Sequence, residues 1–296
     1  IRVPSYYDDV LSKDQDVCKK PEEYIKKIEC LKNGVETVYD PQCDDIIRVI
    51  FMHEFQRAKL AELVKMLSGR DFDTREFRED IIENTYNKLY KGIEKFISEH
   101  NFKQFTIAIK SAGFISNKLI NSNMAIDFAY ALYLILHDSK EVSSSEIKRL
   151  VRRWYVLSVL TGRYSSSPES SFSKDLRQIS EIGVVKTLKN IEAAILSENF
   201  WDVQLPQDLT NTSTNNPTYL VYLAAQVYFN DVSLLSQNIC IKELIELGGD
   251  VHHIFPKQYL KDHNFEKNRY NQEANYAYLD RPVNVSIGKQ SPSDYF

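Results

Sequence analysis

The sequence predicts a mainly α fold, in which an irregular multi-helix domain is followed by a small α+β module. Three observations predict it. The 296 residues contain only nine glycines and nine prolines, which favours long uninterrupted helices over a many-turned β fold. Apolar residues recur at helical spacing through most of the first 245 residues. This periodicity stops near Gly248, so we expect a helical domain at 1–245, with a connector at 1–43, and a separate module at 246–296.

Composition limits the classes of function. With 43% hydrophobic and 26% charged residues the chain can bury a sizeable core. Its net charge of -4 means that any contact with nucleic acid must be local. No apolar run reaches ~18 residues and no signal peptide opens the chain, so a cytoplasmic location is expected. Four cysteines form no CxxC pair and stand near no histidine cluster, so we expect reduced thiols: Cys18, Cys30, Cys43 and Cys240.

The helical domain can be divided along the chain. After a short helix at 21–32, residues 44–70 predict one long helix that ends near Gly69, and 73–100 predict a second, antiparallel helix. Buried helices are expected at 104–122 and 124–137. A helix capped by a serine three residues before Glu146 should run to Gly162. We expect a loop at 165–175, a helix through 188–200, a polar loop at 209–219 and a helix restarting after Pro217.

Three of the six histidines lie in the C-terminal module, and two of them are adjacent. Neighbours on a strand face opposite ways, but at a strand end His252 and His253 can serve different roles around one point. One can bind a metal while the other takes a proton from water, which are the two functions that phosphodiester hydrolysis needs. Asn284 is a candidate oxygen ligand, and the Asn275 amide could fix the intervening loop.

The strings DVHHIFPKQYL, EANYAYLD and VNVSIGKQSPSDY resemble the HNH, or ββα-metal (His-Me finger), nuclease motif. The resemblance implies that His252 is the first metal ligand and His253 the general base. It further implies that Asn275 fixes the loop, Asn284 is the last metal ligand and Lys289 approaches the phosphate. DNA is the implied substrate. The implied cofactor is a divalent metal, Mg²⁺ by expectation, with Mn²⁺ or Ni²⁺ as alternatives. The interval from His253 to Asn275 is longer than in compact HNH modules.

A wider resemblance covers most of the chain. The stretch RRWYVLSVLTGRYSSSPESSFSKDL, followed by helices and HHIFPKQYL, is similar to the carboxyl half of GmrSD-like type IV restriction proteins. In those proteins a ParB-like nucleotide-hydrolysing domain precedes the helical region and the HNH module. The resemblance therefore implies restriction of foreign or modified DNA, and an N-terminal nucleotide-hydrolysing domain of the same protein as a partner. Because the sequence begins at Ile1, we interpret it as a fragment of a longer chain.

The sequence allows several alternatives. The module could be a degenerate HNH copy in a non-catalytic helical adaptor that binds nucleic acid or a partner subunit. A structural zinc site on His252, His253 and His263 lacks a cysteine ligand. Asp250 could replace His252 as a ligand or form part of a turn. Arg163 could fix a helix end or bind phosphate. One basic run could be a solvated face or a DNA-contact stripe: Lys148, Arg149, Arg152 and Arg153.

Overall fold

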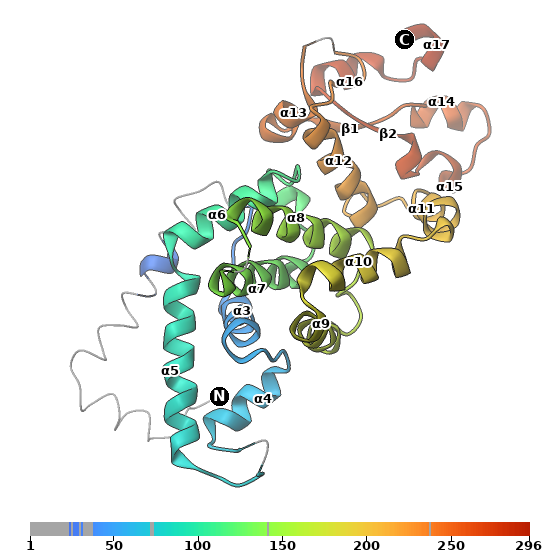
Figure 1. The fold of residues 1–296 in the computed structure, drawn as a ribbon. Coiled ribbons are helices and arrows are strands. Elements are labelled where there is room, and N and C mark those ends of the chain that lie inside the picture. The colour runs from blue at the N-terminus through green and yellow to red at the C-terminus, as the bar shows by residue number, and fades with distance from the viewer. Residues whose placement is uncertain are drawn as a thin grey trace.

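The computed structural model describes residues 24, 26–29, 31, 38–71, 74–140, 142–236 and 238–296. These residues are mainly helical, with one two-stranded antiparallel sheet near the C-terminus (Figure 1). The predicted fold class, mainly α with a small α+β part, is confirmed. Most of the predicted connector at 1–43 lies outside the described residues. No helix in the described part of the chain combines the length and apolar character needed to cross a membrane.

The helical part runs from α3 to α13. Its elements are α3 (Cys43–Phe55), α4 (Leu60–Leu67), α5 (Glu79–Phe96), α6 (Glu99–Lys110), η1 (Asn117–Leu119), α7 (Asn123–Ser139), α8 (Ser144–Leu160), α9 (Pro168–Ile182), α10 (Val184–Ile195), η2 (Phe200–Gln204), α11 (Leu205–Asp208), α12 (Pro217–Phe229) and α13 (Ile241–Leu247). The C-terminal module contains β1 (Asp250–His253), α14 (Lys257–Asp262), α15 (Lys267–Tyr270), η3 (Glu273–Asn275), β2 (Tyr276–Leu279), α16 (Arg281–Ile287) and α17 (Pro292–Tyr295).

Helix α7 lies at the centre of the helical part and packs against α3 and α8. Its apolar residues occupy nearly every position rather than one stripe, as expected of a helix that is buried on all sides. Tyr130 of α7 stacks on Phe105 with ring centroids 4.6 Å apart, and its hydroxyl donates to the Phe96 carbonyl. The buried carboxylate of Asp127 accepts hydrogen bonds from Tyr39 and Arg48 at 2.8 and 3.1 Å. A buried carboxylate needs such partners.

The single helix predicted at 44–70 is wrong, because α3 ends at Phe55 and α4 begins at Leu60. Gln56 has a left-handed backbone, with φ of 54°, and its side-chain amide donates to the His53 carbonyl at 2.8 Å. The first turn of α4 is satisfied from α9, since the Leu60 amide donates to the Glu169 carboxylate at 3.3 Å. Tertiary packing against α9 therefore overrides the continuous apolar pattern.

The loop predicted at 165–175 is also wrong, because α9 begins at Pro168. Pro168 occupies the first turn, where its missing amide costs nothing. Phe172, Leu176 and Ile179 then recur at helical spacing and are buried. Asp175 is fully buried on the same helix and takes both nitrogen contacts from Arg163. The interaction of Arg163 is thus an ion pair with α9.

Only the first part of the helix predicted at 104–122 is present, since α6 ends at Lys110 and η1 follows. Gly113 lies between them with φ of 93°, and a Cβ built there would lie 1.8 Å from the carbonyl oxygen of Ala224 in α12. Glycine is required for this contact between the turn and α12.

The predicted start of α8 is confirmed, since Ser143 accepts a hydrogen bond from the Glu146 amide at 3.3 Å. The predicted restart at Pro217 is confirmed as well. Helix α12 then runs from the helical part toward the C-terminal module (Figure 1). It packs against α13, which in turn contacts β2. One continuous core therefore links the two parts of the chain.

Candidate metal centre

The two histidines end strand β1, as expected from the sequence. β1 pairs antiparallel with β2, so that His252 lies opposite Ala277 and His253 opposite Tyr276. Between α13 and β1 the backbone passes close to β2, because a Cβ on Gly249 would lie 2.9 Å from the Leu279 carbonyl oxygen. The two imidazoles are therefore held by a short sheet rather than by a free loop.

His252 and Asn284 lie together although 32 residues separate them in the sequence. The distance from His252 Nδ1 to Asn284 Oδ1 is 2.7 Å, and Asn284 is presented by α16. His252 is buried, with an exposed fraction of 3%, and burial lowers the pKa of its imidazole, which the Asn284 contact partly offsets. The structure thus brings the two predicted metal ligands into direct contact.

Each ring nitrogen of His252 has one polar neighbour, Asn284 at Nδ1 and Tyr295 of α17 at Nε2. The shorter contact is a hydrogen bond from Nδ1–H to Asn284 Oδ1 at 2.7 Å, because an amide oxygen only accepts, and the Tyr295 oxygen lies 3.4 Å from Nε2. With the ring proton on Nδ1, the lone pair is on Nε2, and metal binding at Nδ1 would require the proton to move to Nε2. A divalent cation bound by both atoms would take the place of the proton that they now share.

His253 is held as a neutral imidazole. Its Nε2 lies 3.1 Å from Asn271 Oδ1, and its ring packs edge-on against Tyr276 with centroids 4.8 Å apart. Burial lowers the pKa of His253 to about 4, the Asn271 contact partly offsets this, and the charges of Lys257 and His252 lower it further. Because Nε2–H donates to Asn271, Nδ1 keeps its lone pair, and in the described structure this atom has no hydrogen-bond partner.

Asn275 fixes the segment that follows the histidines. Its Oδ1 accepts from the Phe255 amide at 2.8 Å, and its Nδ2 donates to the carbonyls of Phe255 and Tyr270 at 3.1 and 2.9 Å. The Ile254 amide also donates to the Asn275 carbonyl at 2.8 Å. These contacts match the loop-fixing role that the sequence suggested for this amide.

The donor set of His252 and Asn284 fits a divalent cation. Adjacent ligands of an octahedral cation with bonds of about 2.1 Å lie about 3 Å apart, close to the observed 2.7 Å. One imidazole and one amide oxygen leave the other positions to water and phosphate oxygens, as in an open catalytic site. An imidazole ligand suits later transition metals as well as Mg²⁺.

The remaining sequence candidates lie apart from this pair. Lys289 is exposed and makes no described hydrogen bond or ion pair with either histidine. His263 contacts Tyr259 instead, with Nδ1 2.8 Å from its carbonyl oxygen, which gives no support to a three-histidine zinc site. Asp250 is a partly exposed partner of Arg281 at 3.7 Å.

Three residues at the site were not singled out from the sequence. These are Asn271 on His253, Tyr295 on His252, and Lys257, whose charge acts on His253. The run NRYNQEAN contains three asparagines in eight residues. This composition indicates a loop, but it does not show which of the three amides contacts His253. Lys257 directly follows Pro256 at the start of α14, where a cation after the histidine pair could have been noticed.

A second group of possible ligands lies in the helical part. His53 approaches Asp138 at 2.9 Å and Glu54 at 3.2 Å, and the three side chains could in geometric terms hold a cation. The Lys95 ammonium already contacts both carboxylates, at 2.8 Å from Glu54, and supplies the positive charge there. We assign this group to the packing of α3, α5 and α7.

Comparison with known proteins adds no assignment. No family model, curated protein or solved structure matches this chain. The function of this chain is therefore inferred from the geometry of the C-terminal module.

Proposed function

We propose that this chain is a metal-dependent DNA endonuclease of the HNH type that hydrolyses phosphodiester bonds. One observation carries the proposal. His252 and Asn284 offer a nitrogen and an oxygen 2.7 Å apart, and the next residue of β1, His253, is an imidazole that is neutral at pH 7 and whose Nδ1 has no described hydrogen-bond partner. Metal binding and proton abstraction are the two functions that this reaction requires.

A divalent cation on His252 and Asn284 would hold the scissile phosphate and neutralise the charge that develops on its leaving oxygen. His253 supplies the base, since its Nδ1 can accept a proton from an attacking water. Asn271 holds the ring through Nε2 and keeps Nδ1 directed away from itself. The negative charge of a bound phosphate would raise the pKa of His253 and make it a stronger base than in the free protein.

DNA binding must depend on local positive charge, since the whole chain carries a net charge of -4. Lys257 is exposed and lies close enough to His253 to lower its pKa, which favours it over Lys289 as the phosphate contact. The rest of the proposal depends on the family resemblance alone. It comprises a cytoplasmic location, a role in restriction of foreign or modified DNA, and an N-terminal nucleotide-hydrolysing domain in the same protein.

The proposal is tested by nicking of supercoiled plasmid with added Mg²⁺, Mn²⁺ or Ni²⁺, and with EDTA as the metal-free control. We expect nicking with at least one of these ions, none with EDTA, and a large loss in Asn284→Ala. The matched control is Asn268→Ala, which removes an exposed asparagine of the same module. Nicking that persists in EDTA would contradict the proposal.

The second candidate is a non-catalytic adaptor with a degenerate module that binds nucleic acid or a partner subunit. One observation favours it, because the Tyr295 hydroxyl lies on His252 Nε2 and the ligand pair contains no carboxylate. The same plasmid then distinguishes the candidates. Retardation of the plasmid in a gel, without nicking under any of the three ions, would favour the adaptor.

A further inference from the structure

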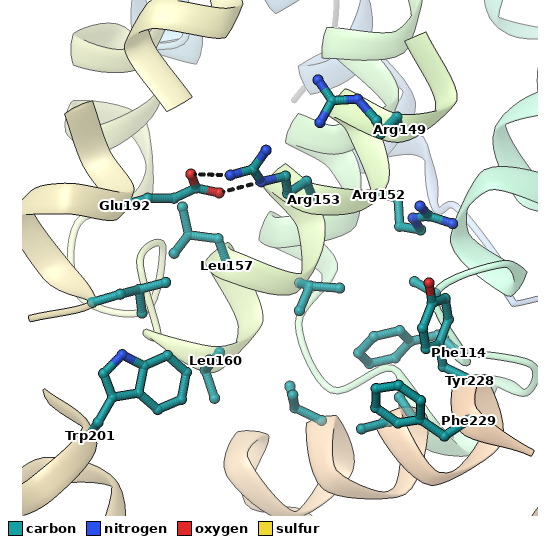
Figure 2. A pocket seen from close by; sticks show the side chains of 16 residues that line it. Phe114, Arg149, Arg152, Arg153, Leu157, Leu160, Glu192, Trp201, Tyr228 and Phe229 are labelled. Atoms are coloured by element: carbon teal, nitrogen blue, oxygen red, sulfur yellow. Dashed lines mark hydrogen bonds and ion pairs between the residues drawn. The ribbon is translucent and has the colours of Figure 1, made fainter. Parts of the chain in front are cut away.

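A pocket of about 490 Å³ lies in the helical part, away from the histidine module. It is formed between α8, α10, the π-helical turn η2 and α12, and Figure 2 shows its side chains. Its volume is in the range of small-molecule sites. Aliphatic and aromatic side chains make most of its lining, and three arginines and Glu192 are the charged members.

Aromatic rings stand at both ends of the pocket. In Figure 2, Trp201 lies at one end, and Phe114, Tyr228 and Phe229 gather at the other. Trp201, Tyr228 and Phe229 are 47%, 53% and 72% exposed, so these large rings are not used in the core. Trp201 lies on the π-helical turn η2. Such turns are rare in proteins overall, and many of those that occur are at functional sites.

The three arginines differ in their partners. Arg153 makes two contacts with Glu192 at 2.7 and 2.6 Å, and Arg149 makes two with Glu146 at 2.8 and 2.6 Å. Arg152 has no carboxylate partner within the described structure. Its guanidinium lies 5.7 Å from the ring centroid of Tyr228. The pocket therefore contains one positive charge that is not neutralised, next to an aromatic wall.

We propose that this pocket binds an aromatic anion, with its planar ring against Tyr228 and Phe229 and its acidic group on Arg152. The apolar lining favours the ring, and the unpaired guanidinium is complementary to the acidic group. A free small molecule or the nucleotide unit of a single strand could supply this chemistry. The lining offers few polar groups to recognise one ring, so selectivity should come from charge. This inference is independent of the nuclease proposal.

The test is calorimetric titration of the whole chain with 2-naphthoate and with 2-naphthamide, its neutral analogue of nearly the same shape. We expect naphthoate to bind at least about tenfold more tightly, because only the carboxylate engages Arg152. Arg152→Gln should remove this difference, whereas the control Arg177→Gln, an exposed arginine on α9, should leave it unchanged. Equal affinity for the two probes in the unaltered chain would overturn the proposal.

A second variant tests the location of the site without changing an arginine. Ala225 lines the pocket, so Ala225→Leu should fill it and weaken naphthoate binding at least about tenfold. Undiminished binding in this variant would also overturn the proposal. A short oligodeoxyadenylate that competes with naphthoate would identify the nucleotide unit as the source. Failure to compete, with naphthoate binding intact, would identify a free small molecule.

Discussion

His252 Nδ1 and Asn284 Oδ1 lie 2.7 Å apart, and the Tyr295 oxygen lies 3.4 Å from the other ring nitrogen of His252. β1 presents the imidazole and α16 presents the amide, with β2 between them in the sequence. The pair is therefore a product of the whole module. A divalent cation bound to both atoms would take the place of the proton that they share.

The first prediction concerns metal affinity. Asn284→Ala should weaken Mn²⁺ binding by about tenfold or more, since even outer contacts of metal ligands contribute 10- to 100-fold as a rough guide. Asn284→Asp should strengthen it, because a carboxylate replaces the neutral oxygen donor. Calorimetry with Mn²⁺ measures both effects. Unchanged affinity in Asn284→Ala, with Asn268→Ala as the exposed control, would exclude Asn284 as a ligand.

The second prediction treats Asn271 as a positioning residue for His253. Asn271→Ala should lower the nicking rate by about 10- to 100-fold because the ring loses its Nε2 partner at 3.1 Å. Mn²⁺ affinity should not change, since Asn271 does not contact His252 or Asn284. Asn271→Asp keeps an acceptor oxygen and should restore part of the rate. Loss of metal affinity together with the rate would instead indicate general damage to the module.

The third prediction concerns the loop-fixing amide. Asn275→Ala removes hydrogen bonds to Phe255 and Tyr270 and leaves their backbone groups without this partner. The free energy of unfolding should fall by about 1–3 kcal/mol. Urea denaturation checks this value, and Asn268→Ala, on the surface, should change it by less than about 0.5 kcal/mol. Equal stabilities of the two variants would show that the loop does not need the amide.

The fourth prediction is a dependence of stability on pH through Glu273. This carboxyl is buried, and burial raises its pKa to about 7, with a smaller opposing effect of Asn216 and a further rise from Asp208. The folded state therefore binds the proton more tightly than the unfolded state, in which the pKa is near the ordinary 4.5. Stability from this group is complete below pH ~4.5 and is lost as the pH rises through about 7.

Glu273→Gln should remove that dependence. At pH 8.5 the variant should be more stable to urea than the unaltered chain by about 3 kcal/mol, and near pH 4 the two should be equal. The control Glu266→Gln changes an exposed glutamate of the same module and should be neutral at both values. A constant difference across the range would contradict the assigned cause.

Local signals predicted much of the fold. α8 and α12 begin where expected. Ser143 caps α8 by accepting from the Glu146 amide, and Pro217 stands in the first turn of α12, where its missing amide costs nothing. The break after Phe55 could not be predicted, because Glu169, more than a hundred residues away, satisfies the next helix. The helix at Pro168 was not predicted because its first turns are rich in serine, which is typical of loops, although Phe172, Leu176 and Ile179 had helical spacing.

Some residues of the candidate site could likewise be predicted from the sequence, and others could not. Adjacent histidines and two asparagines made His252, His253, Asn275 and Asn284 visible in the sequence, and the structure gives each one a specific contact. The contacts of Asn271 and Tyr295 depend on the path of the chain between α14 and α17. No spacing rule predicts such contacts.

The most direct test of the central claim is the nicking rate of supercoiled plasmid by His253→Ala at saturating Mn²⁺. The account predicts a loss of about 10²-fold or more, because the variant lacks the atom that takes the proton from water. His263→Ala, which removes the nearby histidine tied to Tyr259, should retain the full rate. A His253→Ala variant that nicks as fast as the unaltered chain would contradict the account.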